Sequence, residues 1–195
     1  MSKRKEIILA IVGMVIVAII ILFIWAIQNK KITPFAGTVH SASLSISPAV
    51  GVLQLNQEFI AEILVDAQDL QSSGIELLIN YDSAKIEIID QDSAKEGIQI
   101  AASGLFPIVF ENIVDESSGT IRFSTSKGKD DSIFINSPRV LAEINLKPTG
   151  VVDSTQLNFD FTKGKTSDCN VFQYSNGLEQ DVLFGVNNGY YQILE

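Results

Sequence analysis

The sequence predicts an all-β domain, an antiparallel β-sandwich, preceded by one N-terminal membrane-spanning helix. Two observations support this fold class. The first 31 residues contain one long apolar run, whereas the rest of the chain consists of short apolar runs separated by turn formers such as Pro-Thr-Gly and Asn-Asn-Gly. After residue 31 no stretch of sequence shows a 3.6-residue apolar period over three helical turns.

The predicted helix is Ile7–Ile27, a run of 21 residues without a charge. At about 1.5 Å per residue it would be roughly 30 Å long, which matches the hydrocarbon core of a bilayer. A cleaved secretion signal is the alternative, but its apolar region is usually about 7 to 15 residues and ends in a small-residue cleavage site. The stretch from Trp25 to Lys30 has no such site. We therefore expect an uncleaved anchor.

Basic residues flank the apolar run on both sides. Lys3, Arg4 and Lys5 precede it, and Lys30 and Lys31 follow it. Because the N-terminal tail is short and basic, we expect it to stay in the cytoplasm while the rest is exported. The expected organisation is a cytoplasmic tail (1–6), a transmembrane helix (7–27), a linker (28–41) and an extracytoplasmic β-sandwich (42–195) of a single-pass cell-membrane protein.

The charge divides along the same boundary. Residues 1–31 carry five basic residues and one acidic residue, a net charge of +4, so the total of −9 leaves −13 for residues 32–195. An acidic domain repels nucleic acid, which excludes nucleic acid as an expected partner. The single cysteine, Cys169, cannot form an internal disulfide, so the domain has to be stabilised by its core.

The strands are predicted from runs rich in Ile, Val, Phe and Tyr. Their regular spacing is typical of a β-sandwich. The predicted strands cover residues 43–47, 59–65, 75–79, 85–89, 97–101, 120–125, 140–146, 156–161, 171–174, 182–186 and 190–194.

The sequence offers few groups for catalysis. The only histidine, His40, lies in the predicted linker, and Cys169 is better explained as a small, partly buried residue. One histidine and one cysteine do not make a tetrahedral zinc site, and no glycine-rich phosphate-binding motif is present in the sequence. Acidic residues are numerous enough for a two-carboxylate glycosidase, but a sandwich of this size leaves little chain for a deep cleft. We expect a protein that is not an enzyme.

Calcium is the one metal that the sequence suggests. Thr166, Asp168 and Asn170 supply oxygen ligands in a polar loop between two predicted strands. Calcium takes six to eight oxygens, so a second loop, which contains Asp66 and Asp69, would have to converge with the first. The alternative is that Asp168 and Asn170 form an Asx-type turn.

Four short segments follow one another in the first half of the predicted domain. They are Ser45-Ile46-Ser47-Pro48, Asn56-Gln57-Glu58-Phe59-Ile60-Ala61, Gly74-Ile75 and Tyr81-Asp82-Ser83-Ala84-Lys85-Ile86-Glu87-Ile88. In this order and spacing they resemble bacterial cohesin modules. The second half continues the resemblance, so that it covers most of residues 42–194. Asn56, where a glycine is usual, and the extended segment 104–119 depart from the pattern.

The resemblance implies a jelly-roll sandwich of about nine strands that binds a protein partner, such as a dockerin-type module, through one sheet face at the cell surface. A carbohydrate-binding or envelope-structural module that recognises surface polysaccharide is the alternative. A row of exposed aromatic rings would indicate sugar, and a face with an apolar centre would indicate protein. The only tryptophan lies in the predicted anchor, which favours protein.

Tyr81 and Asp82 form the centre of a polar turn between two predicted strands. We expect Asp82 to cap the turn by accepting backbone N–H bonds, and the Tyr81 ring to cover the end of the core. The alternative is that both residues belong to a binding surface.

Overall fold

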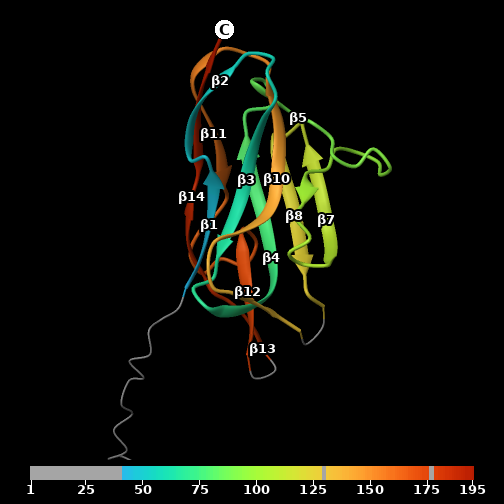
Figure 1. Cartoon of the computed structure of the whole chain (residues 1–195), viewed down its shortest axis with the longest axis vertical. Helices are drawn as coiled ribbons and strands as arrows, with labels where there is room; N and C mark the ends of the chain where they lie inside the picture. Colours follow the sequence, from blue (N-terminus) through green and yellow to red (C-terminus); the bar gives the residue numbers. More distant parts are fainter. Residues whose placement is uncertain (1–40, 129–130, 176–177) are drawn as a thin grey trace, which may run out of the picture. The chain divides into compact units, whose positions relative to one another are not determined.

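The computed structural model describes residues 41–128, 131–175 and 178–195, which form two packed β-sheets (Figure 1). Within these ranges every regular element is a strand, and no helix is present that could cross a membrane. The predicted tail, the span 7–27, His40 and almost all of the predicted linker lie outside the described residues. The predictions made for them stay predictions.

The first sheet has six strands in the order β14-β1-β3-β10-β5, with β6 pairing with β10. Adjacent strands are antiparallel except β1 and β14, which are parallel. The strands are β1 (Ala42–Ser47), β3 (Phe59–Asp66), β5 (Ile86–Ile88), β6 (Ala101–Ala102), β10 (Arg139–Pro148) and β14 (Leu183–Asn187).

The second sheet has nine strands, of which β13-β12-β4-β11-β15-β2 form a continuous path. β8 and β9 pair with the other edge of β4, and β7 pairs with β8. The strands are β2 (Val50–Gln54), β4 (Leu70–Tyr81), β7 (Ile108–Asp115), β8 (Thr120–Ser126), β9 (Ile133–Ile135), β11 (Val152–Phe159), β12 (Asn170–Ser175), β13 (Leu178–Asp181) and β15 (Gly189–Leu194).

The all-β sandwich prediction is confirmed, with two corrections. The sandwich is not purely antiparallel, because β1 pairs with β14 and β2 pairs with β15 in parallel. Both exceptions arise where the chain passes from one sheet to the other while keeping its direction, once between β1 and β2 and once between β14 and β15. The described residues also form fifteen strands rather than about nine.

The extra strands lie where the sequence lacks a clear two-residue period. β2, β7, β9 and β13 were not predicted, and the strand predicted at residues 97–101 is reduced to β6 and an isolated bridge between Ile98 and Val114. In β7 a bulge between Val109 and Glu111 interrupts the alternation.

The core lies between the sheets and depends strongly on β4. Its residues Ile75, Leu77 and Ile79 point inward and are 0–4 % exposed. On the facing sheet, Ile63 and Val65 of β3 are fully buried. Each such side chain stabilises the fold by about 1.5–3 kcal/mol relative to an exposed position. The opposite face of β4 is thereby left for the surface of the domain.

The turn at Tyr81 and Asp82 has the predicted structural role. The Asp82 carboxylate accepts a hydrogen bond from the Ala84 N–H at 3.0 Å, and the Asp82 carbonyl accepts bonds from Lys85 and Ile86. Tyr81 is only 8 % exposed and belongs to the core cluster. Burial raises the pKa of Tyr81 to about 12, so its hydroxyl stays protonated at neutral pH.

A glycine substitution tests how tightly this turn is packed. Gly119 has φ = +65°, and its carbonyl accepts a hydrogen bond from the Tyr81 N–H. A Cβ added to Gly119 would collide with the Tyr81 carbonyl oxygen. Gly104 has φ = +77° and open space around it. We expect Gly104→Ala to lower the free energy of unfolding by about 1–2 kcal/mol through left-handed strain. Gly119→Ala should cost roughly 1–3 kcal/mol more, because it adds a steric clash. If urea denaturation shows that Gly104→Ala and Gly119→Ala lose the same free energy of unfolding, this packing is contradicted.

Candidate functional site

The outer face of the nine-stranded sheet carries a groove of about 690 Å³. It lies where β12, β4, β8 and β7 run side by side (Figure 1). Two rows of side chains cross these strands in register. The first row is Phe172, Gly74, Ser126 and Ile108, and the second is Asn170, Glu76, Ser124 and Glu111.

The floor of the groove is made of small residues. A Cβ on Gly74 would lie 2.9 Å from the backbone oxygen of Thr125, so this close approach of β4 to β8 requires glycine. Ser124 and Ser126 continue the floor on β8. The hollow therefore follows from the sequence of β4 and β8.

The two sides of the groove are apolar. On one side the bulge in β7 brings Phe110 to the surface, where it is 72 % exposed. On the other side stand Phe172 and Tyr174 of β12 and Leu178 of β13, and Leu178 is also 72 % exposed. Large apolar side chains this exposed contribute little to the core, and together they indicate a binding surface.

Carboxylates line the groove between its apolar sides. Burial is the main cause that raises the pKa of Glu76, a hydrogen bond from Asn170 opposes the shift, and the charges of Glu111, Glu179 and Asp181 add to it. The Ser73 hydroxyl donates to the Glu179 carboxylate at 2.9 Å and so fixes its position. The groove is therefore acidic, and its surroundings disfavour the ionised form of Glu76.

Arg122 is the one basic side chain that forms an ion pair beside the groove within the described residues. Its Nε lies 3.0 Å from a carboxylate oxygen of Glu111, and both side chains are partly exposed. A surface pair of this kind contributes about 0–1 kcal/mol to stability. It neutralises Glu111, whereas Glu76 and Glu179 have no cationic partner among the described residues.

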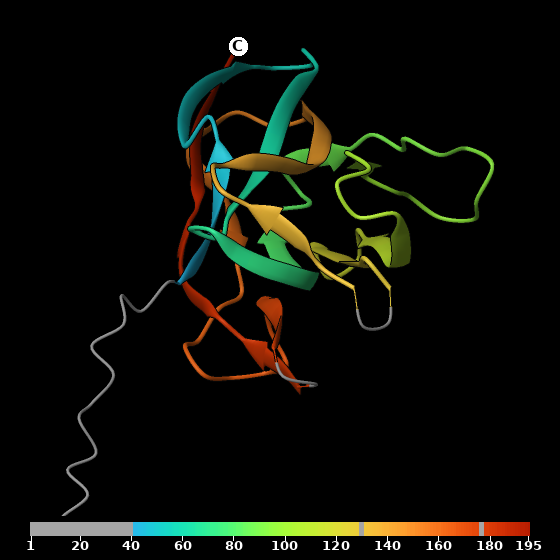
Figure 2. The same cartoon turned by 60° about the horizontal axis from the view of Figure 1, so that its bottom comes forward.

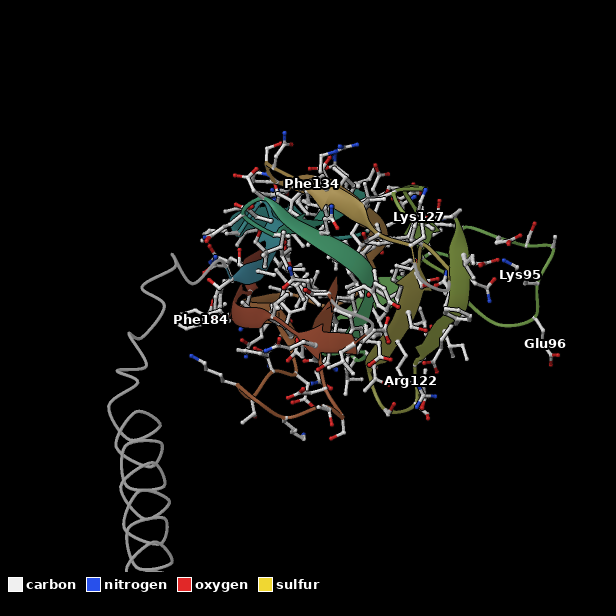
Figure 3. The ribbon with its side chains drawn as sticks, turned by 90° about the horizontal axis from the view of Figure 1, so that it is seen from below. Lys95, Glu96, Arg122, Lys127, Phe134 and Phe184 are labelled. Carbon is white, nitrogen blue, oxygen red and sulfur yellow. The ribbon has the colours of Figure 1, made fainter. Side chains whose placement is uncertain are left out.

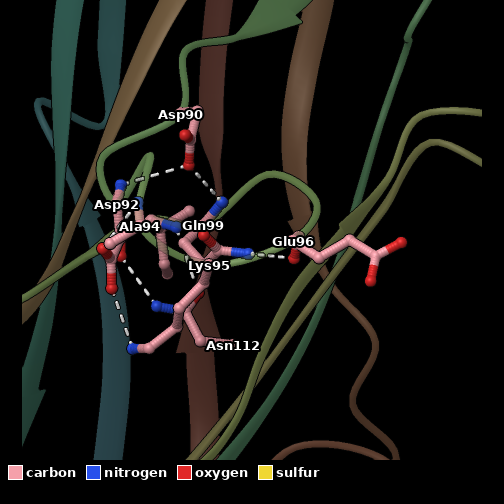
Figure 4. Close-up of polar contacts among 8 residues, drawn as sticks. Asp90, Asp92, Ala94, Lys95, Glu96, Gln99 and Asn112 are labelled. Atoms are coloured by element: carbon pink, nitrogen blue, oxygen red, sulfur yellow. Dashed lines mark hydrogen bonds and ion pairs between the residues drawn. The ribbon is translucent and has the colours of Figure 1, made fainter.

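A loop preceding β7 covers part of that strand's free edge. The Asp90 carboxylate accepts hydrogen bonds from the N–H groups of Asp92 and Gln99, and Lys95 pairs with Asp92 at 2.9 Å (Figure 4). Asn112 of β7 then binds both backbone groups of Ile100, at 2.8 and 3.0 Å. The second half of the β7 edge is thereby closed, while Phe110 stays accessible.

The structure places Thr166 and Asp168 in the loop between β11 and β12, and Asn170 at the first residue of β12. Thr166 is exposed, whereas Asp168 and Asn170 are buried. One Asp168 oxygen accepts the Thr162 N–H at 2.6 Å, and the Asn170 amide donates to Glu76, Thr166 and Asp168. The remaining side-chain oxygens of Asp168 and Asn170 have no hydrogen-bond partner.

The second predicted calcium loop does not join the first. Asn170 is in register with Glu76, whereas Asp69 precedes the first residue of β4. Seven residues of strand separate these positions by about 23 Å. The Asp66 carboxylate is occupied with the Gln68 N–H at 3.0 Å. In the described ranges no three His, Cys, Asp or Glu side chains cluster as metal ligands, so calcium at Thr166, Asp168 and Asn170 stays a prediction.

Cys169 is fully buried, and its thiol exchanges hydrogen bonds with the backbone of Leu78 at 3.2 and 3.3 Å. Burial raises the pKa of this thiol to about 12, so it stays protonated at neutral pH. A protonated, buried thiol is a poor nucleophile.

Neither a protein-family model nor a curated protein matches the sequence. Solved structures of cohesins do match the fold. A type II cohesin from the cellulosome of Acetivibrio cellulolyticus has a TM-score of 0.58 and 14 % identity, over 77 % of this chain and 95 % of that chain. A type I cohesin–dockerin complex from Clostridium thermocellum has a TM-score of 0.56 and 14 % identity, over 79 % and 94 %.

A non-cellulosomal cohesin from the archaeon Archaeoglobus fulgidus is also similar, with a TM-score of 0.54 and 12 % identity, over 80 % of this chain and 92 % of that chain. At such identities the likeness shows the fold alone. The described domain therefore has a cohesin-like fold, as the sequence resemblance implied.

The sequence did not reveal the residues that shape the groove. Phe110 lies in the segment that departs from the cohesin pattern, and Leu178 begins a strand that was not predicted. The run Ile108-Val109-Phe110 is the one signal that could have identified a surface strand, because three consecutive large apolar residues cannot all face the core.

The raised pKa of Glu76 predicts a pH effect. Its folded pKa lies above the ordinary value of 4.5, so its contribution to stability is fully present below pH 4.5 and is lost as the pH rises through the folded pKa. Glu76→Gln keeps an acceptor for Asn170 and removes the charge. We expect the melting temperature of this variant at pH 7 to equal or exceed that of the unsubstituted protein. Acidification should raise the melting temperature of the variant less than that of the unsubstituted protein. Glu87→Gln, on the other sheet, serves as the control. A clear loss of stability at pH 7 would contradict the account.

The calcium prediction is tested by thermal unfolding. A ligand specific for the native state stabilises it by about 2.7 kcal/mol at a hundredfold excess over its Kd. We expect calcium to raise the melting temperature of the unsubstituted protein and to have a smaller effect on Asp168→Asn, which keeps an acceptor for the Thr162 N–H. If millimolar calcium and chelator give the same melting temperature, Asp168 and Asn170 are turn residues only.

Proposed function

We propose that residues 42–195 form a binding module that docks a protein partner through the groove between β7 and β12. The observation that carries this proposal is the pairing of two highly exposed apolar side chains, Phe110 and Leu178, with an acidic groove between them. Apolar anchors with polar surroundings are typical of protein interfaces. Catalysis plays no part in the proposal.

The chemistry of the groove defines the partner. An apolar side chain of the partner would contact Phe110 and Leu178, and a lysine or arginine beside it would pair with Glu76 and Glu179. Burial is the main cause of the raised pKa of Glu76, and the partner's charge would offset the further contribution of the neighbouring carboxylates. The net charge of −13 also favours a basic partner and predicts an association rate that falls as salt rises.

The similar structures support a protein partner rather than a polysaccharide. The Clostridium thermocellum structure is a cohesin–dockerin complex, which makes a dockerin-type module the first candidate. The exposed aromatic residues of the described chain do not form one row, because none of their strands is a neighbour of another. They are Phe110 of β7, Phe134 of β9 and Tyr190 of β15 in the nine-stranded sheet, and Phe184 of β14 in the six-stranded sheet. Figure 3 shows Phe134 and Phe184 well separated. Polysaccharide remains the alternative that the experiment has to exclude.

The membrane anchor is part of the proposal. Ile7–Ile27 would hold the module at the outer surface of the cell membrane, on a linker formed by residues 28–41. The full-length protein should then stay with membranes after carbonate washing. Release of a soluble form that begins near residue 40 would contradict it.

A binding assay with matched variants tests the docking proposal. Both sheets and the core lie within residues 40–195, which form a compact unit of their own, so this fragment can be immobilised. We expect it to bind at least one purified dockerin from a panel. Phe110→Asp with Leu178→Asp should weaken binding at least tenfold, or about 1.4 kcal/mol. Phe134→Asp, an exposed residue outside the groove lining, is the control.

The same assay includes soluble and insoluble polysaccharides. Retention of polysaccharide together with no binding to any dockerin would overturn the proposal. If the double variant Phe110→Asp with Leu178→Asp and the control Phe134→Asp lose the same binding affinity, the assignment of the groove as the docking site is also contradicted.

A further inference from the structure

The opposite margin of the nine-stranded sheet ends in β2, which has a free edge. In the part of the chain that the structure describes, β2 pairs with β15 alone, and Figures 1 and 2 show it along the margin of the domain. The Tyr190 N–H donates to Ala49, and the Leu55 N–H donates to Leu194. In a parallel ladder every second residue of a strand directs its backbone N–H and C=O to the same neighbouring strand. Because Ala49 and Leu55 bond to β15, the backbone groups of Val50, Val52 and Gln54 point away from it.

This free edge has none of the features that usually protect an edge strand. Residues 49–55 contain no charge and no proline, whereas the edge strands β7 and β13 carry acidic residues. Val50 and Val52 are 74 % and 57 % exposed. An open, apolar and uncharged edge is a template for pairing with another strand.

The surroundings of β2 carry little charge, because Asp153 of β11 is the only charged residue that lines the two hollows beside this strand. A groove of about 570 Å³ lies beside it and is lined by residues of β1, β14, β15 and the turns next to them, including Ser45, Val186, Asn188 and Tyr190. No charged side chain lines this groove. On a domain of net charge −13, such a margin is a place where two copies can approach without strong repulsion.

We infer that the β2 edge pairs with the β2 edge of a second copy of this chain. In an antiparallel arrangement with its two-fold axis at Val52, each Val52 lies opposite its equivalent, and Val50 lies opposite Gln54 of the second copy. Two bonds between the Val52 backbones and two from Gln54 N–H to Val50 C=O would join groups that have no partner in the described chain. The exposed valines would pack together on one face.

The pairing leaves the proposed docking groove open. β15 and β11 separate β2 from β4, and the groove lies on β4 itself and on the neighbouring strands β12, β8 and β7. A dimer would therefore present two grooves. This inference does not depend on the function of the groove, and failure of either proposal leaves the other intact.

Disulfide trapping tests the pairing and its register. Opposite residues of a hydrogen-bonded antiparallel pair have Cα atoms about 5.5 Å apart, which suits a disulfide. In the fragment 40–195 we expect Val52→Cys to form a covalent dimer under mild oxidation. Gln54→Cys is the matched control, because four residues of strand would place the Cα atoms of the two substituted residues about 14 Å apart. Cys169 is buried with a raised pKa and should not react.

Sedimentation equilibrium measures the pairing without cross-linking. Five residues of edge bury less than a standard interface of about 1,200–2,000 Å², so we expect a dimer that grows with concentration towards the millimolar range. Val52→Lys should abolish it, whereas Val151→Lys, at an exposed turn valine, should not. A monomer at every concentration, no cross-link in Val52→Cys, or equal cross-linking of Gln54→Cys would overturn the inference.

Discussion

The central constraint of this domain is the long strand β4, whose two faces have different roles. One face supplies Ile75, Leu77 and Ile79 to the core, and the other supplies Gly74 and Glu76 to the groove. Its edges bond to β8 and β9 on one side and to β11 and β12 on the other. Because adjacent residues of a strand face opposite ways, a shift of register by one residue would exchange core and groove. The packing of the sandwich and the shape of the groove are therefore specified together.

The groove concentrates negative charge on an apolar surface. Hydrogen bonds from Ser73 to Glu179 and from Asn170 to Glu76 hold two carboxylates in place without a cation beside them in the described chain. Such an arrangement costs folding free energy, which a basic partner would offset on binding. The apolar sides would supply affinity, and the carboxylates would supply specificity and a faster association. The same charges disfavour a polyanionic ligand.

The sequence predicted the elements with a regular period and missed those without one. The alternation in β3 and β4 revealed the core, and the polar turn after Tyr81 was predicted correctly because Asp82 caps it locally. Phe110 was missed because a bulge breaks the period of β7, and Leu178 because its strand is only four residues long.

The parallel pairs with β14 and β15 depend on contacts between distant segments, which periodicity does not encode. The two acidic loops suggested for calcium lie about 23 Å apart along β4, a separation that only the register of β12 reveals.

Hydrogen–deuterium exchange of the fragment 40–195, alone and with a dockerin selected from the panel, tests the central claim most directly. The account predicts slower exchange in residues 108–115, 120–126 and 170–175, where β7, β8 and β12 border the groove, and no change in the six-stranded sheet. Protection confined to β1, β3 and β10, with none beside Phe110, would contradict it.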